Sequence, residues 1–228
     1  KIFLIGLDKL NVKTLFAIIG GSIGGSLIWE MAAISPNLCE NLIPIACDWK
    51  SSDWLIANTR LQHQILNNSR KPIHDARIHA MLCYRSPKSF EKKFNRTINQ
   101  ELGIFNVESW LLHHGEKLQK RFQLASYKLM NHLLSTADIT NKNECKFSKI
   151  ASKISGNIYI VSVNSDLFFT DYQNRDTFYK LCKVKENVFF KTIKSDHGHD
   201  AFLIEFTQLT ELLQKIFNNR NSSVSLLT

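Results

Sequence analysis

The feature that most restricts the fold of this chain is a glycine-rich turn around Ser22. Four of the nine glycines lie within residues 20–25, and residues 20–24 spell G-x-S-x-G. The apolar residues 15–19 before the turn are typical of a buried strand, and helical spacing begins after it, over residues 26–35. This context predicts a nucleophile elbow, in which a strained turn exposes the serine at the sheet edge. The backbone N–H of Ile23 is then placed to stabilise an oxyanion.

Three other interpretations of this segment compete with the elbow. Residues 15–34 carry only one charge, Glu30, and contain Gly20-x-x-x-Gly24, a pattern also found in membrane helices. The glycines form helices poorly, however, so we predict no membrane span. A phosphate-binding loop needs a Lys after Gly or a G-x-G-x-x-G register, and neither is present in good form. The remaining alternative is a turn that serves only strand–helix packing.

The order of the other segments predicts an α/β fold with a parallel sheet. The expected strands are residues 14–19, 41–47, 158–163 and 187–193, and the expected helices between and after them include 26–35, 171–182 and 201–217. Residues 51–139 have helical spacing and no convincing strand. We therefore expect a core of residues 1–50 and 140–217, a helical lid of residues 51–139, and a flexible tail of residues 218–228.

A hydrolase-type serine needs a base and an orienting carboxylate, in the chain order Ser, Asp, His. Asp166 follows the expected strand 158–163, and His199 follows the expected strand 187–193. The carboxyl ends of parallel strands share one edge of a sheet, so these side chains should meet Ser22 there. His199 would take the Ser22 proton and Asp166 would hold the imidazole tautomer. Asp171 is a weaker alternative to Asp166 because it lies further from the strand end.

Charge and metal-ligand patterns exclude several classes. The net charge is +9, with eight basic residues and two acids between positions 70 and 96, but no zinc-finger or RNA-binding signature accompanies them. The basic stretch is either a solvated helical face or an attractor for a polyanionic ligand, and we predict no nucleic-acid partner. The pairs His113-His114 and His197-x-His199 lack further ligands at suitable spacing, so we predict no metal. Five cysteines without a C-x-x-C pair indicate free thiols and a cytoplasmic location.

Several motifs, in the right order, resemble those of the homoserine O-acetyltransferase family of the α/β-hydrolase superfamily. The elbow followed by Trp29-Glu30 resembles the family's GGSMGG…EW. The other matching segments are Ser52-Asp53-Trp54 through Gln62, Ala76-Arg77, Tyr84-Arg85-Ser86, Phe94-Asn95-Arg96, Val107-Glu108-Ser109-Trp110-Leu111, Arg121-Phe122 to Ser126-Tyr127, Ser165-Asp166-Leu167-Phe168, and Gly198-His199-Asp200-Ala201-Phe202-Leu203. The resemblance extends over most of residues 1–216.

This resemblance implies an α/β-hydrolase fold and a ping-pong acyl transfer in methionine biosynthesis. Acetyl-CoA, a co-substrate and not a permanently bound cofactor, would acylate Ser22, and the hydroxyl of homoserine would collect the acetyl group. Asp200 would hold the substrate amino group. His63, aligned with a family Arg, and nearby Arg60 would face the substrate carboxylate. The resemblance also implies a homodimer formed through the lid.

Other functions remain open at this point. A serine O-acetyltransferase or O-succinyltransferase, an esterase of the same fold, and an inactive half-domain that acts as an interaction module are the alternatives. In this fold the elbow follows the fifth strand, whereas Ser22 lies near the first residue of this sequence. We therefore expect a fragment of a longer natural chain, or a missing half that is disordered or lies on another polypeptide. That half would carry the early strands and the second oxyanion N–H.

Overall fold

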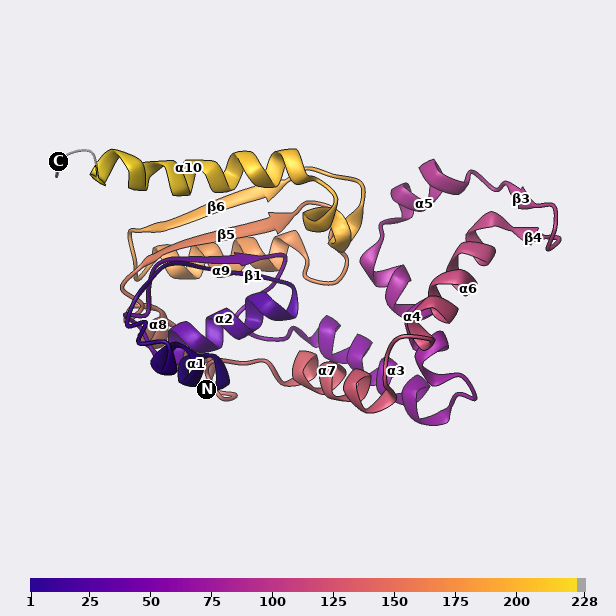
Figure 1. The fold of residues 1–228 in the computed structure, drawn as a ribbon, viewed down its shortest axis with the longest axis horizontal. Coiled ribbons are helices and arrows are strands. Elements are labelled where there is room, and N and C mark those ends of the chain that lie inside the picture. The colour runs from indigo at the N-terminus through magenta and orange to yellow at the C-terminus, as the bar shows by residue number, and fades with distance from the viewer. Residues whose placement is uncertain (225–228) are drawn as a thin grey trace.

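A computed structural model describes residues 1–224 of the protein. Its centre is a sheet of four strands in the order β1-β2-β5-β6, and every neighbouring pair is parallel. The strands are β1 (Leu15–Gly21), β2 (Cys39–Ile45), β5 (Asn157–Val163) and β6 (Val188–Ile193). Their carboxyl ends all point toward the lid (Figure 1). The predicted parallel sheet is confirmed.

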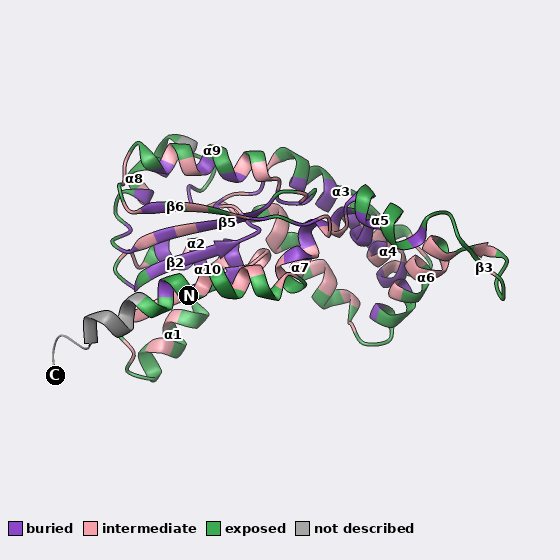
Figure 2. Ribbon diagram, turned by 90° about the horizontal axis from the view of Figure 1, so that it is seen from above, coloured by how far each residue is buried: buried purple, intermediate pink, exposed green. Residues whose placement is uncertain are grey.

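Helices cover both faces of the sheet, as the nearly continuous apolar strands require. Leu42 and Ile158 face one core cluster, whereas Ile43 and Val161 face a second one, because successive strand residues point to opposite sides. Figure 2 shows the buried strands between the more exposed helices. The helices outside the lid are α1 (Ile2–Lys9), α2 (Ile23–Ile34), α8 (Phe147–Ala151), α9 (Asp171–Cys182) and α10 (Phe206–Val224).

One edge of the sheet and one helix carry exposed apolar side chains. β1 pairs only with β2, and Ile19 on this edge strand is 43% exposed. Helix α1 has no buried residue, and its Ile2 and Phe3 are 83% and 58% exposed. The early strands expected for this fold have no counterpart among the described residues, so β1 is an uncovered edge in this part of the protein.

The predicted helical block forms a lid beyond the carboxyl ends of the strands (Figure 1). Its helices are α3 (Asp53–Asn68), α4 (Pro72–Tyr84), α5 (Pro87–Phe94), α6 (Asn106–Gln119) and α7 (Leu124–Thr136). Ser52 and Ser86 cap the starts of α3 and α5, and Pro opens both α4 and α5. A small antiparallel hairpin was not expected from the sequence. Its strands β3 (Ile98–Asn99) and β4 (Ile104–Phe105) are too short to give a period-2 pattern.

A narrow neck joins the lid to the core. Lys50 and Asp138 form an antiparallel bridge, the Ser51 N–H donates to the Ala137 carbonyl at 2.8 Å, and the Ile139 N–H donates to the Trp49 carbonyl at 3.3 Å. The chain therefore enters and leaves the lid at adjacent points. The neck lies close to the predicted boundaries at residues 51 and 139.

Several boundaries differ from those expected. The expected helix 201–217 is divided into a 3₁₀ segment, η2 (Gly198–Leu203), and α10, which continues to Val224. Residues 218–224 of the expected flexible tail are therefore helical, and 225–228 lie outside the described residues. The expected linker contains η1 (Glu144–Lys146) and the start of α8.

The membrane-helix alternative for residues 15–34 is wrong, because this segment divides into β1 and α2 on either side of Ser22. Within the described part of the chain, none of the helices has the length and the apolar character that crossing a bilayer requires.

Candidate active site

Ser22 occupies the sharp turn between β1 and α2, as the G-x-S-x-G pattern predicts. Its backbone has φ 54° and ψ −128°, a conformation that non-glycine residues rarely adopt and that costs about 1–3 kcal/mol. The Ser22 N–H donates to the Ile45 carbonyl at 2.9 Å, which ties the turn to β2. The first hydrogen bonds at the start of α2 run from the Gly25 and Ser26 N–H groups to the Ser22 carbonyl, so the N–H of Ile23 precedes them in the chain. Such N–H groups can stabilise a developing oxyanion.

Two glycines allow the strand, the helix and the neighbouring strand to approach this closely. A Cβ on Gly20 would lie 2.3 Å from the Gly24 carbonyl oxygen, and a Cβ on Gly25 would lie 2.0 Å from Cys47 Sγ. Gly24, the last residue of the motif, has open space around its Cα. Gly20 and Gly25 therefore permit close packing, and this packing holds Ser22 above the sheet.

The structure brings Ser22, His199 and Asp166 into one hydrogen-bonded chain. His199 Nε2 lies 2.8 Å from Ser22 Oγ, and His199 Nδ1 lies 2.7 Å from Asp166 Oδ2. The imidazole is 3% exposed and the Asp166 residue 4% exposed. The other oxygen, Asp166 Oδ1, accepts from the backbone N–H groups of Phe168 at 2.7 Å and Phe169 at 2.9 Å. The buried carboxylate thus has partners for both of its oxygens.

Aromatic rings enclose the imidazole of His199. The ring centroids within 6 Å belong to Tyr84, Phe168, Phe169 and Phe202. Gly198, directly before it, has φ 72°, and a Cβ there would lie 2.8 Å from the Tyr84 carbonyl oxygen of the lid. The histidine loop therefore packs against the end of α4 at a distance that only glycine permits.

Asp171, the weaker candidate for the orienting carboxylate, has other partners. It accepts from the Ser162 hydroxyl, and its Oδ2 lies 2.6 Å from Arg175 Nε. It starts α9, whereas Asp166 lies in the loop that reaches His199. The geometry therefore favours Asp166.

A cavity of about 140 Å³ opens beside Ser22, between the elbow and the lid. Its lining is uncharged and mostly apolar, apart from amide, hydroxyl and imidazole groups. It consists of Ser22, Ile23, Asn58, Thr59, Gln62, His79, Ala80, Cys83, Tyr84, Tyr127, Met130, Asn131, Leu134 and Phe168. Burial lowers the pKa of His79, which keeps this imidazole neutral. The cavity therefore suits a small ligand group without a negative charge.

Charged groups gather on another side of the triad. Asp200 follows His199 and lies 3.7 Å from Arg85 Nη1. Burial raises the pKa of Asp200, and the positive charges of His199 and the two arginines Arg85 and Arg77 oppose that rise. The Arg77 guanidinium lies 5.6 Å from the ring centre of Tyr84. Both arginines belong to motifs that match the family, but their place beside Asp200 could not be predicted. It depends on the packing of α4 against η2, which a linear pattern does not show.

Arg60 and His63, predicted to face the substrate carboxylate, lie outside the cavity beside Ser22. Both are exposed on α3, and they line a separate hollow of about 220 Å³ together with Lys128 and His132. Successive helix residues point about 100° apart, so Gln62 faces the Ser22 cavity while His63 turns away. Arg77 and Arg85 are the cations that accompany Asp200.

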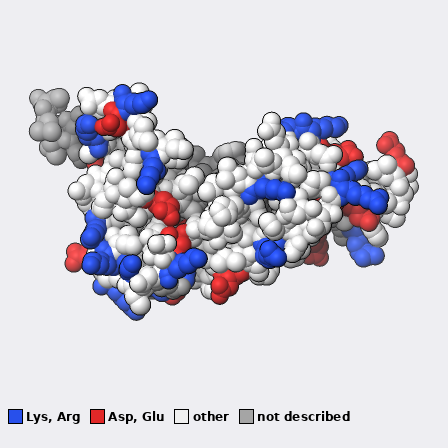
Figure 3. Space-filling model, turned by 90° about the horizontal axis from the view of Figure 1, so that it is seen from below, with Lys and Arg blue, Asp and Glu red and all other residues white. Residues whose placement is uncertain are grey.

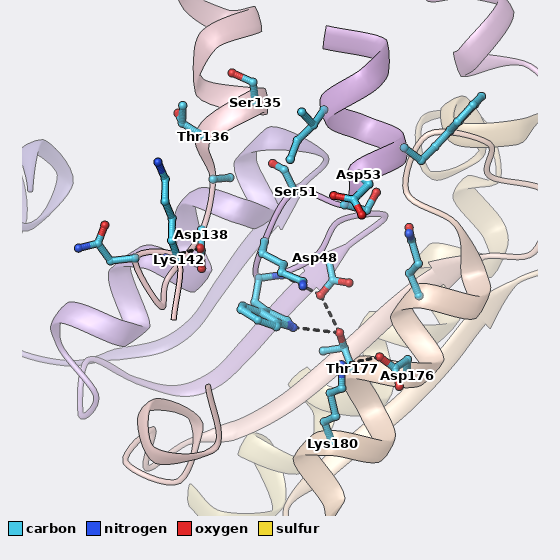
Figure 4. Close-up of a pocket in the computed structure, with 18 of the residues that line it drawn as sticks. Asp48, Ser51, Asp53, Ser135, Thr136, Asp138, Lys142, Asp176, Thr177 and Lys180 are labelled. Atoms are coloured by element: carbon cyan, nitrogen blue, oxygen red, sulfur yellow. Dashed lines mark hydrogen bonds and ion pairs between the residues drawn. The ribbon is translucent and has the colours of Figure 1, made fainter. Parts of the chain in front are cut away.

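A larger cavity lies away from Ser22. It has a volume of about 730 Å³ and surrounds the neck, between the starts of α3 and α9 and the end of α7. Figure 4 shows Asp48 in this cavity with Thr177 beside it. Asp48 Oδ1 accepts from the Thr177 hydroxyl and the Trp49 N–H, both at 2.8 Å. Burial, which outweighs these bonds, raises the pKa of Asp48 to about 7.

The raised pKa of Asp48 predicts that the protein loses stability as pH rises. The unfolded state releases this proton near pH 3.8 and the folded state near pH 7, so the free energy of unfolding falls between these values. The full shift corresponds to about 4 kcal/mol, and because the side chain keeps some solvent contact we expect about 2–4 kcal/mol. Asp48→Asn keeps an acceptor for both donors and should be more stable than wild type at pH 8.

Urea unfolding at pH 5 and pH 8 measures this effect. The matched control is Asp53→Asn, an exposed acid in the same cavity, which should keep the wild-type pH dependence. Equal gains in the free energy of unfolding for Asp48→Asn at both pH values would contradict the raised pKa of Asp48.

No cluster of three or more His, Cys, Asp or Glu side chains suited to a metal ion occurs among the residues that the structure describes.

No family model matches the chain, but individual relatives do. The chain is 31% identical to a homoserine O-acetyltransferase of Chloroherpeton thalassium and 30% identical to one of Nautilia profundicola. The alignments cover 96% and 92% of this chain. The chain belongs to the homoserine O-acetyltransferase family. It spans 63% of the length of both relatives.

Solved structures support the same fold at lower sequence identity. The homoserine O-acetyltransferase from Bacillus anthracis matches with a TM-score of 0.80 and 14% identity, over 95% of this chain and 63% of that one. Esterase E22, as an L374D mutant, matches with a TM-score of 0.82 and 13% identity, over 94% and 64%. The predicted α/β-hydrolase fold is therefore confirmed for this member of the homoserine O-acetyltransferase family.

Proposed function

We propose that the protein transfers an acetyl group from acetyl-CoA to the hydroxyl of homoserine through an acyl-enzyme on Ser22. The observation that carries this proposal is the hydrogen-bonded chain from Ser22 through His199 to Asp166. The relatives carry the name of this activity. Methionine biosynthesis is the corresponding role.

In the first half-reaction Ser22 Oγ attacks the thioester carbonyl carbon while His199 Nε2 takes the hydroxyl proton. The imidazolium is stabilised by the Asp166 carboxylate, which keeps Nδ1 as a donor. The Ile23 N–H contributes to stabilising the oxyanion. When the C–S bond breaks, His199 returns the proton to the sulfur, and CoA leaves as a thiol.

In the second half-reaction the acceptor hydroxyl repeats these steps in reverse. His199 takes its proton, the oxygen attacks the Ser22 ester carbonyl, and the C–O bond to Ser22 breaks as the proton returns to Ser22 Oγ. Asp200 and Arg85 lie together beside His199, and Arg77 lies across Tyr84. A carboxylate and two guanidinium groups suit the amino and carboxylate groups of an amino acid.

The cavity beside Ser22 supports acetyl over succinyl as the transferred group. Succinyl carries a carboxylate, which would need a cation or several donors when desolvated. Lys and Arg are absent from the described lining, and the imidazole of His79 is neutral because burial lowers its pKa. The uncharged lining is compatible with a methyl group. A homodimer formed through the lid and a cytoplasmic location remain predictions.

Free CoA released by the intact protein tests this function. With acetyl-CoA and homoserine together we expect continuous CoA release and O-acetylhomoserine as the product. With acetyl-CoA alone we expect one equivalent of CoA and then a rate at least 100-fold lower, because the acyl-enzyme awaits an alcohol. A direct thiol assay with product detection by mass spectrometry measures both.

The controls separate the alternatives. Serine in place of homoserine tests a serine O-acetyltransferase, and succinyl-CoA tests a succinyltransferase. CoA release at an equal rate without any amino acid would indicate hydrolysis and overturn the transferase proposal. Failure of a fluorophosphonate probe to label Ser22 in the folded protein would favour an inactive interaction module.

A further inference from the structure

A group of basic side chains, four of them Lys or Arg, lies on the lid, outside the cavity beside Ser22. It comprises Arg77 and Arg85 on or after α4, Lys93 on α5, and His114 and Lys117 on α6, and we refer to these five residues as the lid cation cluster. Lys93 Nζ lies 4.8 Å from the ring centre of Trp110, and the Trp110 and His114 rings lie 4.3 Å apart. On the face in Figure 3, Lys and Arg side chains lie over both the core and the lid.

The cluster has too few acidic partners. Arg85 lies 3.7 Å from Asp200. The neighbouring lysines Lys88 and Lys92 both pair with Asp196, at 3.1 and 2.5 Å. Within residues 1–224, by contrast, no carboxylate forms an ion pair with Arg77, Lys93 or Lys117.

Burial and neighbouring positive charges act together on two members of the cluster. Burial lowers the pKa of His114 to about 4, with further lowering by the charges of Arg77, His113, Lys93 and Lys117. Burial also lowers the pKa of Lys93, and the charge of Arg85 adds to this effect. The charges of Arg77, Lys93 and Lys117 therefore act on one place, the neutral His114 ring, where a bound anion would be stabilised.

The cluster begins at the triad and extends away from it. Arg85 contacts Asp200 beside His199, and Arg77 lies over Tyr84, whose ring packs 5.5 Å from that of His199. None of the five residues lines the cavity beside Ser22. One amino-acid carboxylate would occupy the two arginines at most, which leaves Lys93, His114 and Lys117 for a second, larger anion.

We propose that the outer part of the lid cation cluster, Lys93, His114 and Lys117, binds the phosphate groups of the acyl donor, an organic polyphosphate at the far end of a thioester arm. This assignment rests on the proposed function. A phosphate ester presents several oxygen acceptors to the two Lys donors, and its negative charge favours protonation of the His114 imidazole beside them. With its phosphates on α5 and α6, the donor extends inward past Arg85 toward Ser22.

Two thioesters that differ only in their phosphates test the assignment in the intact protein. The double variant Lys93→Gln/Lys117→Gln removes two charges and keeps long polar side chains. We expect kcat/KM for acetyl-CoA to fall about 10- to 100-fold, and kcat/KM for S-acetylpantetheine, which lacks the phosphates, to change less than twofold. The matched control is Lys149→Gln/Lys183→Gln, which removes two exposed charges from the core and should leave both values unchanged.

A second readout does not depend on turnover. CoA should raise the pKa of His114 above about 4, because an adjacent anion favours the imidazolium. Pantetheine should leave it unchanged. Nuclear magnetic resonance of the His114 ring, assigned with His114→Gln, measures this pKa.

The outcomes distinguish this inference from the proposed function. Equal losses with both thioesters, or no loss with acetyl-CoA, would overturn the phosphate site while leaving the acyl transfer intact. If wild type does not react with acetyl-CoA, the proposed function fails. The phosphate site is then decided by the His114 titration, and an unchanged pKa in saturating CoA overturns it.

Discussion

The Ser22→Ala variant should lose at least about 10⁴-fold in kcat for acetyl transfer and form no acyl-enzyme. Ser22 Oγ lies 2.8 Å from His199 Nε2, and alanine leaves the base without a nucleophile. Mass spectrometry of the protein after mixing with acetyl-CoA should detect an acetyl adduct on wild type and none on the variant. Steady-state CoA release measures the loss in kcat.

Ser26→Ala is the matched control for this variant. Ser26 lies one helical turn further along α2, is buried, and donates to the Asp48 carbonyl at 3.1 Å. Its loss should cost about 1 kcal/mol of stability and keep most of the activity. An acetyl adduct on Ser22→Ala, or equal losses in both variants, would contradict the role of Ser22.

The Asp166→Asn variant should lose about 10⁴-fold in kcat while the protein remains folded. The N–H groups of Phe168 and Phe169 both donate to Asp166 Oδ1, so the amide oxygen must take that position. The amide NH₂ then faces His199 Nδ1 and forces it to accept. The imidazole proton moves to Nε2, the nitrogen that must accept the proton of Ser22.

Asp171→Asn separates this effect from the general loss of a buried acid. Asp171 bonds Ser162 and Arg175 and makes no contact with His199, so its variant should keep kcat within about threefold of wild type. Rates measured between pH 6 and 9 should show the Asp166→Asn loss across the whole range. If Asp171→Asn were the more damaging change, the orienting carboxylate would be assigned wrongly.

The parts of the site that local patterns encode could be predicted from the sequence. Ser22 follows from the strand–glycine–helix pattern, and its glycines are required by atoms only a few residues away in the structure. Asp166 and His199 follow from their places directly after β-branched or aromatic strands, because every parallel strand of the sheet ends at the same edge. The confirmed parallel sheet places both residues at that edge, where their side chains form a hydrogen-bonded chain with Ser22.

The parts that depend on packing between distant elements could not be predicted. Which residues of α3 meet the cavity depends on the face that the helix turns toward it, and Gln62 lines the cavity while its neighbour His63 points about 100° away. Asp200 meets Arg85 only because α4 packs against η2. The buried state of Asp48 likewise depends on α9, whose Thr177 is 129 positions away.

The neck between residues 49–51 and 137–139 makes the lid an insertion that leaves the core and returns to it at adjacent points. An insertion whose two ends are hydrogen-bonded neighbours can be lengthened, shortened or exchanged without altering the pairing of the strands beneath it. Ser22, His199 and Asp166 all come from the core, whereas most of the residues that line the cavity beside Ser22 come from the insertion. Evolution can therefore vary what such a protein recognises independently of the chemistry that it performs.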